Sequence, residues 1–95
     1  MIIIELTYTA VLTEIDAHME AHVAFLEKYY ASGKFIASGR KVPRDGGIIL
    51  ATGLTKAEAE ELIKEDPFYQ HHLAKYALTE FAVTKKAAHL ETIFS

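Results

Sequence analysis

One histidine of this 95-residue chain stands in a row of apolar and aromatic side chains. His22 shares spacings of three or four residues with Ile15, Met19, Leu26 and Tyr30, which places all five along one side of a helix. An imidazole titrates near neutral pH, so a partly buried copy that faces a sheet can act as a general base or acid. A core histidine that bonds only a backbone carbonyl is the alternative interpretation of this position.

A carboxylate with a restrained backbone occurs later, in the sequence Asp66-Pro67-Phe68. Pro67 fixes its own backbone and pushes Asp66 out of the helical region, so the carboxylate is held in one direction. Asp before Pro is also a favoured helix start, in which Asp is the N-cap. Both roles can coexist, because an ionised carboxylate accepts several hydrogen bonds and a capping oxygen can still bond an imidazole.

The other histidines carry weaker signals. His18 and His22 have the i, i+4 spacing of two metal ligands, but they lack the Glu of an H-E-x-x-H motif. His71 and His72 are adjacent, so their side chains face different directions and at most one of them can line a site. We therefore expect no metal site and place these histidines at the surface.

Three basic residues surround a predicted turn, where they could meet an anionic ligand or be solvated: Arg40, Lys41 and Arg44. The chain has no cysteine, which excludes thiolate nucleophiles, thiolate metal sites and disulfides. It also lacks a G-x-S-x-G elbow and a glycine-rich loop that leads into a helix. We expect no cofactor.

Periodicity predicts the elements that must position these groups. Alternating and apolar runs predict strands over 2–8, 34–40, 48–51 and 76–83, and helical spacing predicts helices over about 13–33 and 55–65. Within the second strand, one alternating set is Phe35, Ala37 and Gly39 and the other is Ile36, Ser38 and Arg40.

Local signals set the ends of both predicted helices. Thr13 is the expected N-cap of the first helix, and Gly33 suits the left-handed position that closes it. Thr55 and Glu58 form the T-x-x-E pattern of a capping box at the start of the second helix. Pro67 ends that helix.

The element order βαββαβ predicts an α+β fold of the ferredoxin-like type, with a four-stranded antiparallel sheet and both helices on one face. The first strand has isoleucines in both alternating sets, and the last has Phe81 and Val83 opposite Tyr76 and Leu78. A sheet that is apolar on both faces must be covered twice. We therefore expect a homodimer whose sheets pack face to face; apolar residues covered by loops are the alternative.

Composition restricts the protein class. Hydrophobic residues make up 51% and charged residues 24%, which is typical of one folded domain. We place this domain at 1–86 and a C-terminal tail or arm at 87–95. The net charge of −3 disfavours nucleic acid as a partner, and no apolar run is long enough for a membrane span or a secretory signal. The expected location is the cytoplasm.

An ordered set of motifs resembles the YCII-related (YciI-like) family over about residues 2–84. It comprises the helical histidine, Y-x-x-G-K-F-I-A-S-G-R at 30–40, D-G-G-I-I-L at 45–50 and E-D-P-F at 65–68. The resemblance implies a dimeric α+β barrel and an active site made by a His and Asp pair, which match His22 and Asp66. The chain departs from the commoner pattern by lacking an Arg-Pro pair before the histidine and by having Tyr69 and Gln70 after D-P-F, so no substrate is transferred from relatives.

The residues and the resemblance together favour a small lyase-type or isomerase-type enzyme without a cofactor. In this hypothesis Asp66 orients His22, which removes a proton from a small cyclic or carbonyl-containing metabolite. Four further residues are the expected substrate contacts, with Arg40 or Ser38 holding an oxyanion: Ser38, Gly39, Arg40 and Phe68. A dimeric, non-catalytic module that binds a small ligand is the first alternative, and an interaction subunit that docks through its C-terminal arm is the second.

Overall fold

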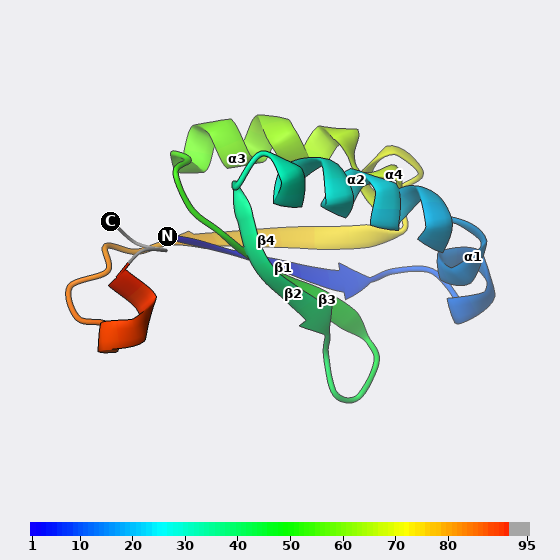
Figure 1. Ribbon diagram of the computed structural model, residues 1–95. Coiled ribbons are helices and arrows are strands. Elements are labelled where there is room, and N and C mark those ends of the chain that lie inside the picture. The colour runs from blue at the N-terminus through cyan, green and yellow to red at the C-terminus, as the bar shows by residue number, and fades with distance from the viewer. Residues whose placement is uncertain (92–95) are drawn as a thin grey trace.

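The computed structural model describes residues 1–91, which form a four-stranded antiparallel sheet with helices on one face (Figure 1). The elements are β1 (Ile2–Tyr8), α1 (Leu12–Ala17), α2 (Met19–Ala31), β2 (Phe35–Arg40), β3 (Gly46–Ala51), α3 (Lys56–Leu62), the 3₁₀ turn η1 (Ile63–Glu65), α4 (Pro67–Gln70), β4 (Ala74–Glu80) and the 3₁₀ turn η2 (Ala88–Leu90). The strand order is β2-β3-β1-β4, and each neighbouring pair is antiparallel. The predicted ferredoxin-like α+β fold is confirmed.

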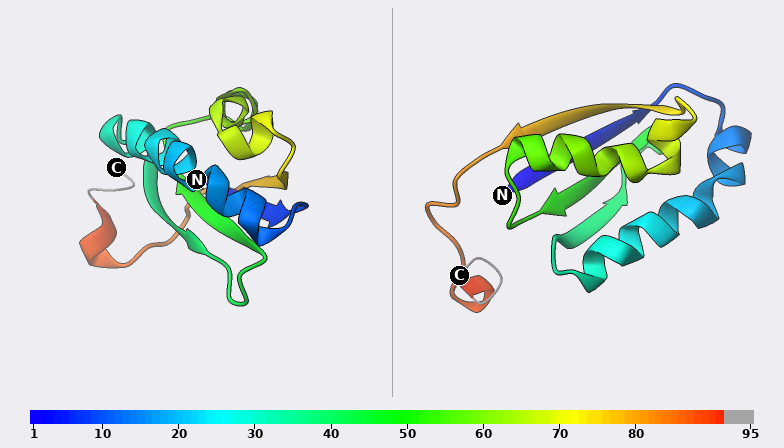
Figure 2. Two further views of the ribbon diagram at one scale, coloured as in Figure 1. Left: turned by 90° about the vertical axis from the view of Figure 1, so that its right-hand side faces the viewer. Right: turned by 90° about the horizontal axis from the view of Figure 1, so that it is seen from above.

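The core lies between the sheet and the layer of α2 and α3, which run side by side above it (Figure 2). The central strand β1 presents Ile2, Ile4 and Leu6 to this layer, and none of them is more than 2% exposed. Phe25 of α2 packs edge-on against Phe35 of β2. Burial of these branched and aromatic side chains is the main stabilising term of the fold.

The first predicted helix is two helices. The chain is already helical at Leu12, because Val11 has extended backbone angles and its carbonyl accepts the first intrahelical bonds, so the expectation that Thr13 is the N-cap is wrong. His18 leaves the helical region with φ −109° and ψ 7°, and this residue separates α1 from α2. The amide of His22 bonds the carbonyl of His18, so a helical hydrogen bond still spans this junction.

The second predicted helix ends earlier than expected, because α3 stops at Leu62 and the 3₁₀ turn η1 covers the remaining residues to Glu65. The glycine and capping-box signals are confirmed. Gly33 has φ +79°, the left-handed conformation that a residue with a Cβ rarely adopts. The Thr55 hydroxyl accepts the Glu58 amide, and the Glu58 carboxylate accepts the Thr55 amide, which completes the capping box.

The last strand is displaced from its predicted position of 76–83. β4 begins at Ala74 and ends at Glu80, which pairs with Ile2, the first residue of its neighbour β1. The pairing continues for one residue beyond β4, because the amide of Phe81 bonds the carbonyl of Met1 at 2.9 Å. The expectation that the last strand continues to Val83 is therefore wrong, and Phe81 is joined to the sheet only through its bonds with Met1.

A β-bulge changes the direction of side chains in β2. One extra residue, Ile36, lies between the paired positions Phe35 and Ala37, so the simple alternation expected over 34–40 is interrupted. Beyond the bulge, Ser38 and Arg40 pair with β3 residues of the helix-covered face. They therefore share this face with Phe35 instead of lying opposite it.

The uncovered sheet face is part apolar and part charged. Ile3, Ile48 and Leu50 are half-buried there by their neighbours. The ammonium group of Lys41 lies 2.9 Å from a carboxylate oxygen of Glu5. This face is less apolar than the sequence predicted.

The segment 81–91 leads away from the sheet and includes η2 (Figures 1 and 2). The predicted tail at 87–95 extends beyond the described residues. The boundary at residue 86 stays a prediction.

Candidate active site

Asp66 is held at the junction of η1 and α4, completely buried. Its backbone is extended, with φ −72° and ψ 126°, as expected for a residue before proline. Its Oδ1 accepts the amide of Phe68 at 3.0 Å, so Asp66 caps α4 while Pro67 occupies the first helical position. The predicted cap is confirmed, and the same carboxylate is aimed into the protein.

His22 reaches this carboxylate from α2. Its Nδ1 lies 2.8 Å from Oδ1 of Asp66, although the two residues are 44 positions apart. An ionised carboxylate only accepts hydrogen bonds, so Nδ1 carries the proton in this contact and a neutral His22 has its lone pair on Nε2. The His22 side chain is 12% exposed, which leaves it open to a small ligand.

The imidazole is fixed by stacking as well as by hydrogen bonding. The ring of His22 lies parallel to that of Phe68, with 4.1 Å between centroids and 9° between planes. Phe68 is buried and belongs to the turn that Asp66 caps. One short turn therefore sets both the position and the plane of the imidazole.

A third residue completes the surroundings of Asp66. The hydroxyl of Tyr76 on β4 donates to Oδ2 at 2.6 Å. Burial raises the pKa of Tyr76 well above its ordinary value, and the negative charge of Asp66 raises it further, so the hydroxyl stays protonated as a donor. Sequence reasoning placed Tyr76 among apolar residues; only its need for a partner when buried pointed to a polar role.

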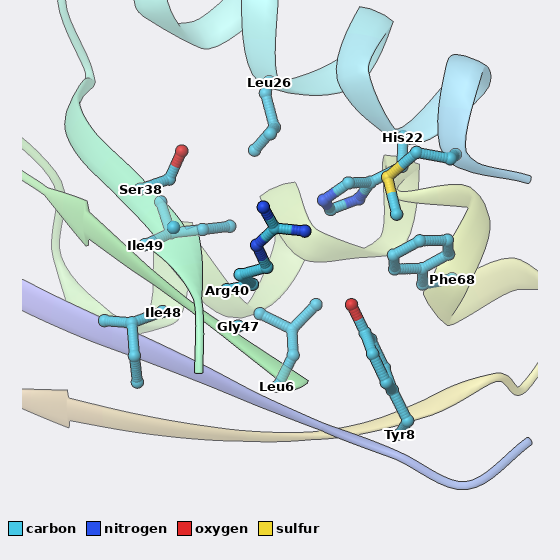
Figure 3. Close-up of a pocket in the computed structure, with 12 residues that line it drawn as sticks. Leu6, Tyr8, His22, Leu26, Ser38, Arg40, Gly47, Ile48, Ile49 and Phe68 are labelled. Atoms are coloured by element: carbon cyan, nitrogen blue, oxygen red, sulfur yellow. The ribbon is translucent and has the colours of Figure 1, made fainter. Parts of the chain in front are cut away.

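A cleft of about 160 Å³ opens beside His22, between α2 and the sheet (Figure 3). Five of the six residues predicted for the site line this cleft: His22, Ser38, Gly39, Arg40 and Phe68. Its remaining wall was not predicted and consists of Leu6, Tyr8, Met19, Leu26, Gly47, Ile48 and Ile49. Asp66 lies behind the imidazole and does not line the cleft.

Two polar groups point into this space with His22. Figure 3 shows the guanidinium of Arg40 and the hydroxyl of Tyr8 directed towards the imidazole. Among residues 1–91, no carboxylate forms an ion pair with Arg40, so its charge is available to an anion. Ser38 lies at the edge, where its hydroxyl is 2.6 Å from that of Tyr30.

The sequence matches one family model. The YCII-related domain aligns with residues 1–82, which include every strand and helix up to β4. The chain belongs to the YCII-related family. The resemblance drawn from the motifs is confirmed.

A solved structure has the same fold as this YCII-related chain. It is 5-chloro-2-hydroxyhydroquinone dehydrochlorinase from Burkholderia phenoliruptrix in complex with 2,5-dihydroxybenzoquinone. The TM-score is 0.71 with 17% sequence identity, and the match covers 86% of this chain and 94% of that one. No curated protein matches the sequence.

The YCII-related chain keeps its other histidines outside the cleft. The rings of His18 and His71 lie against each other, with centroids 4.3 Å apart, at the junction of α1 and α2. His72 is exposed and has φ +56°. Across the described residues 1–91, no three His, Asp or Glu side chains converge as a group that could hold a metal ion.

The basic residues around the turn have separate roles. Lys41 pairs with Glu5 on the uncovered sheet face, and Arg44 pairs with Asp16 of α1. Of the three, Arg40 alone lines the cleft. Within residues 1–91, no helix has the length and apolar character that a membrane crossing requires.

Proposed function

We propose that this chain is an enzyme that removes a proton from a small, oxygenated ring compound and thereby drives an elimination or an isomerisation. The observation that supports the proposal is the 2.8 Å contact between Nδ1 of His22 and Oδ1 of Asp66 at the wall of a cleft. A general base must be held in one tautomer, and its second nitrogen must meet the substrate. His22 satisfies the first condition, and its place in the cleft supports the second.

The proposed reaction uses groups of this chain alone. Nε2 of His22 takes a proton from the carbon next to a carbonyl group, and the electron pair of the broken C–H bond moves onto the carbonyl oxygen. Arg40 donates hydrogen bonds to the resulting enolate. The electron pair then returns to expel a leaving group from the neighbouring carbon, or the proton returns at a different carbon. Asp66 stabilises the imidazolium in between.

The size and lining of the cleft support a single-ring substrate. A volume of about 160 Å³ suits a molecule of one ring with a few oxygen substituents. Leu6, Leu26 and Ile49 offer apolar contact to a ring, and Arg40 offers a charge to its oxygen. The dehydrochlorinase of the same fold is described in complex with a dihydroxybenzoquinone, a compound of this class.

Replacing His22 tests the proposal. Candidate ring compounds, including chlorinated hydroxyhydroquinones and cyclic diketones, are incubated with the protein in D₂O, and proton exchange and product formation are followed by NMR. We expect His22→Gln to lower the rate by about 10²- to 10⁴-fold, because an amide cannot act as the base. His18→Gln, one helical turn earlier, is the matched control and keeps the rate. Full activity of His22→Gln would rule the mechanism out.

A ligand-binding role without turnover is supported by one observation. Asp66 is wholly buried and its Oδ1 also caps α4, so the contact with His22 has a structural use whether or not chemistry follows. In that case ring compounds bind to the wild-type protein without proton exchange, and His22→Gln lowers the melting temperature more than His18→Gln does.

We further propose that the uncovered sheet face packs against a second copy of the chain. Half-buried Ile3, Ile48 and Leu50 supply apolar area, and the pair of Lys41 and Glu5 can be met by the same pair of a copy. Light scattering at micromolar concentration is expected to give twice the 10.6 kDa chain mass, and Leu50→Glu is expected to halve it. A wild-type mass of one chain would refute this part.

A further inference from the structure

The carboxylate of Asp66 is shared unequally among its donors. Oδ1 accepts both Nδ1 of His22 and the amide of Phe68, whereas among residues 1–91 Oδ2 accepts only the hydroxyl of Tyr76. The Tyr76 contact is 2.6 Å long and comes from β4, whereas the His22 contact comes from α2. The tyrosine does not line the cleft, so it does not meet a substrate there.

A hydrogen bond to one oxygen of a carboxylate weakens the attraction of the other oxygen for a cation. Each hydrogen bond that a carboxylate accepts withdraws part of its negative charge, and the effect is strong in a buried site. A carboxylate with less charge attracts an imidazolium more weakly. The Tyr76 hydroxyl therefore opposes protonation of His22 through the carboxylate that both side chains bond.

We propose that Tyr76 is a positioning residue that acts through Asp66 to keep His22 neutral, and thus competent as a base, at lower pH than it would otherwise be. The proposal rests on the proposed function of His22 and extends it to a residue of β4. The rigidity of the arrangement supports it, because Tyr76 pairs with Leu6 in the sheet ladder and its ring packs edge-on against Tyr69.

Four other charged or titratable side chains lie near His22 or Tyr76. Arg40 of β2 and Tyr8 of β1 line the cleft with His22, and His18 lies one turn earlier in the chain. Tyr69 of α4 packs against Tyr76. Because Tyr76→Phe leaves all of these groups in place, a change in the titration of His22 reports the lost hydroxyl.

NMR titration of the His22 ring tests the proposal without any turnover. The His22 signals are assigned by their loss in His22→Gln and then followed against pH in the wild type, in Tyr76→Phe and in Tyr69→Phe. We expect the midpoint of the His22 titration to rise by about half to one pH unit in Tyr76→Phe, because Asp66 then carries more charge. Tyr69→Phe is the matched control, since its hydroxyl bonds nothing among residues 1–91, and its midpoint stays at the wild-type value.

The outcomes separate this inference from the proposed function. An unchanged or lower midpoint in Tyr76→Phe overturns the role of Tyr76, even if His22→Gln proves the enzyme mechanism. A raised midpoint supports it even if no substrate is turned over. With a substrate, the acid limb of the rate profile is expected to move by the same amount, a loss of about three- to tenfold in rate at low pH.

A second measurement decides the question if Tyr76→Phe does not fold. In the wild-type protein the Cζ resonance of Tyr76 should move in step with the titration of His22, because both side chains bond the same carboxylate. A Tyr76 resonance that stays constant while His22 titrates overturns the proposal.

Discussion

Two carboxylates that are adjacent in the sequence, Glu65 and Asp66, have the same kinds of partner and opposite surroundings. Each accepts a hydrogen bond from a basic residue of α2 and from a tyrosine. The buried cluster consists of His22, Asp66 and Tyr76, and the exposed cluster consists of Lys28, Tyr29 and Glu65. The side chain of Asp66 is 0% exposed, and that of Glu65 is 44% exposed.

The difference between the two clusters shows that burial decides what a set of donors does. In the exposed cluster, water and salt compete with each contact, so the ion pair contributes little. In the buried cluster a donor or acceptor without a protein partner cannot form a hydrogen bond with water instead. Loss of one partner is therefore costly, and each side chain is held in place. The extended backbone of Asp66 before Pro67 sends its side chain inward, while Glu65 stays at the surface of η1.

Neutralising each carboxylate in turn is expected to give the largest contrast. Asp66→Asn puts an amide where three donors converge, so we expect a loss of about 2–4 kcal/mol in the free energy of unfolding and loss of measurable proton exchange. Glu65→Gln removes an exposed charge and is expected to change both quantities far less. Chemical denaturation and the D₂O assay measure the two effects. Equal losses in both variants would contradict the comparison.

Replacing Arg40 in the cleft and Lys28 in the exposed cluster is expected to give a contrast of intermediate size, in ligand affinity alone. Arg40→Gln is expected to weaken the binding of 2,5-dihydroxybenzoquinone by about 10-fold or more, because a hydrogen bond from a charged donor in the cleft is lost. Lys28→Gln changes the exposed cluster and should leave the affinity at the wild-type value. Isothermal titration calorimetry gives both constants. An affinity that is the same in the two variants would exclude Arg40 as the anion contact.

The smallest expected effect is the pH dependence of the exposed cluster. The hydrogen bond from Lys28, followed by that from Tyr29, lowers the pKa of Glu65 below its ordinary value. The stabilisation by Glu65 is therefore complete above the pKa of an unfolded glutamate, about 4.3, and is lost as pH falls through the lower value of the folded state. The difference in melting temperature between wild type and Glu65→Gln should thus shrink between pH 7 and pH 3. A difference that widens towards acid pH would show that another group is responsible.

Much of the fold was predictable because its signals are local. The capping box of Thr55 and Glu58, the left-handed Gly33 and the Asp66 cap each depend on residues within a few positions, and all three are confirmed. The displaced β4 was not predictable in this way. Its last residue is set by the start of β1, which is a matter of pairing between distant segments.

Some residues of the candidate site also carry local signals, and others do not. His22, Asp66 and Arg40 could be selected from their types, their neighbours and the family motifs. Tyr8 and Tyr76 could not, since a tyrosine in an alternating strand has no local mark of a polar role. The Tyr76 hydroxyl meets Asp66, and Tyr8 comes to line the cleft, only when the sheet and the helices are packed together.

The sequence by itself determined the family, the order of the elements and the two side chains best suited to acid–base chemistry. Only the tertiary structure decided that His22 and Asp66 meet at 2.8 Å, that Tyr76 holds the second oxygen, and that the bulge at Ile36 brings Arg40 to the cleft. The physical reason is the distance along the chain over which each interaction acts. Caps, turns and periodicity act over a few residues, whereas a bulge and a bond across 44 residues depend on which surfaces pack against each other.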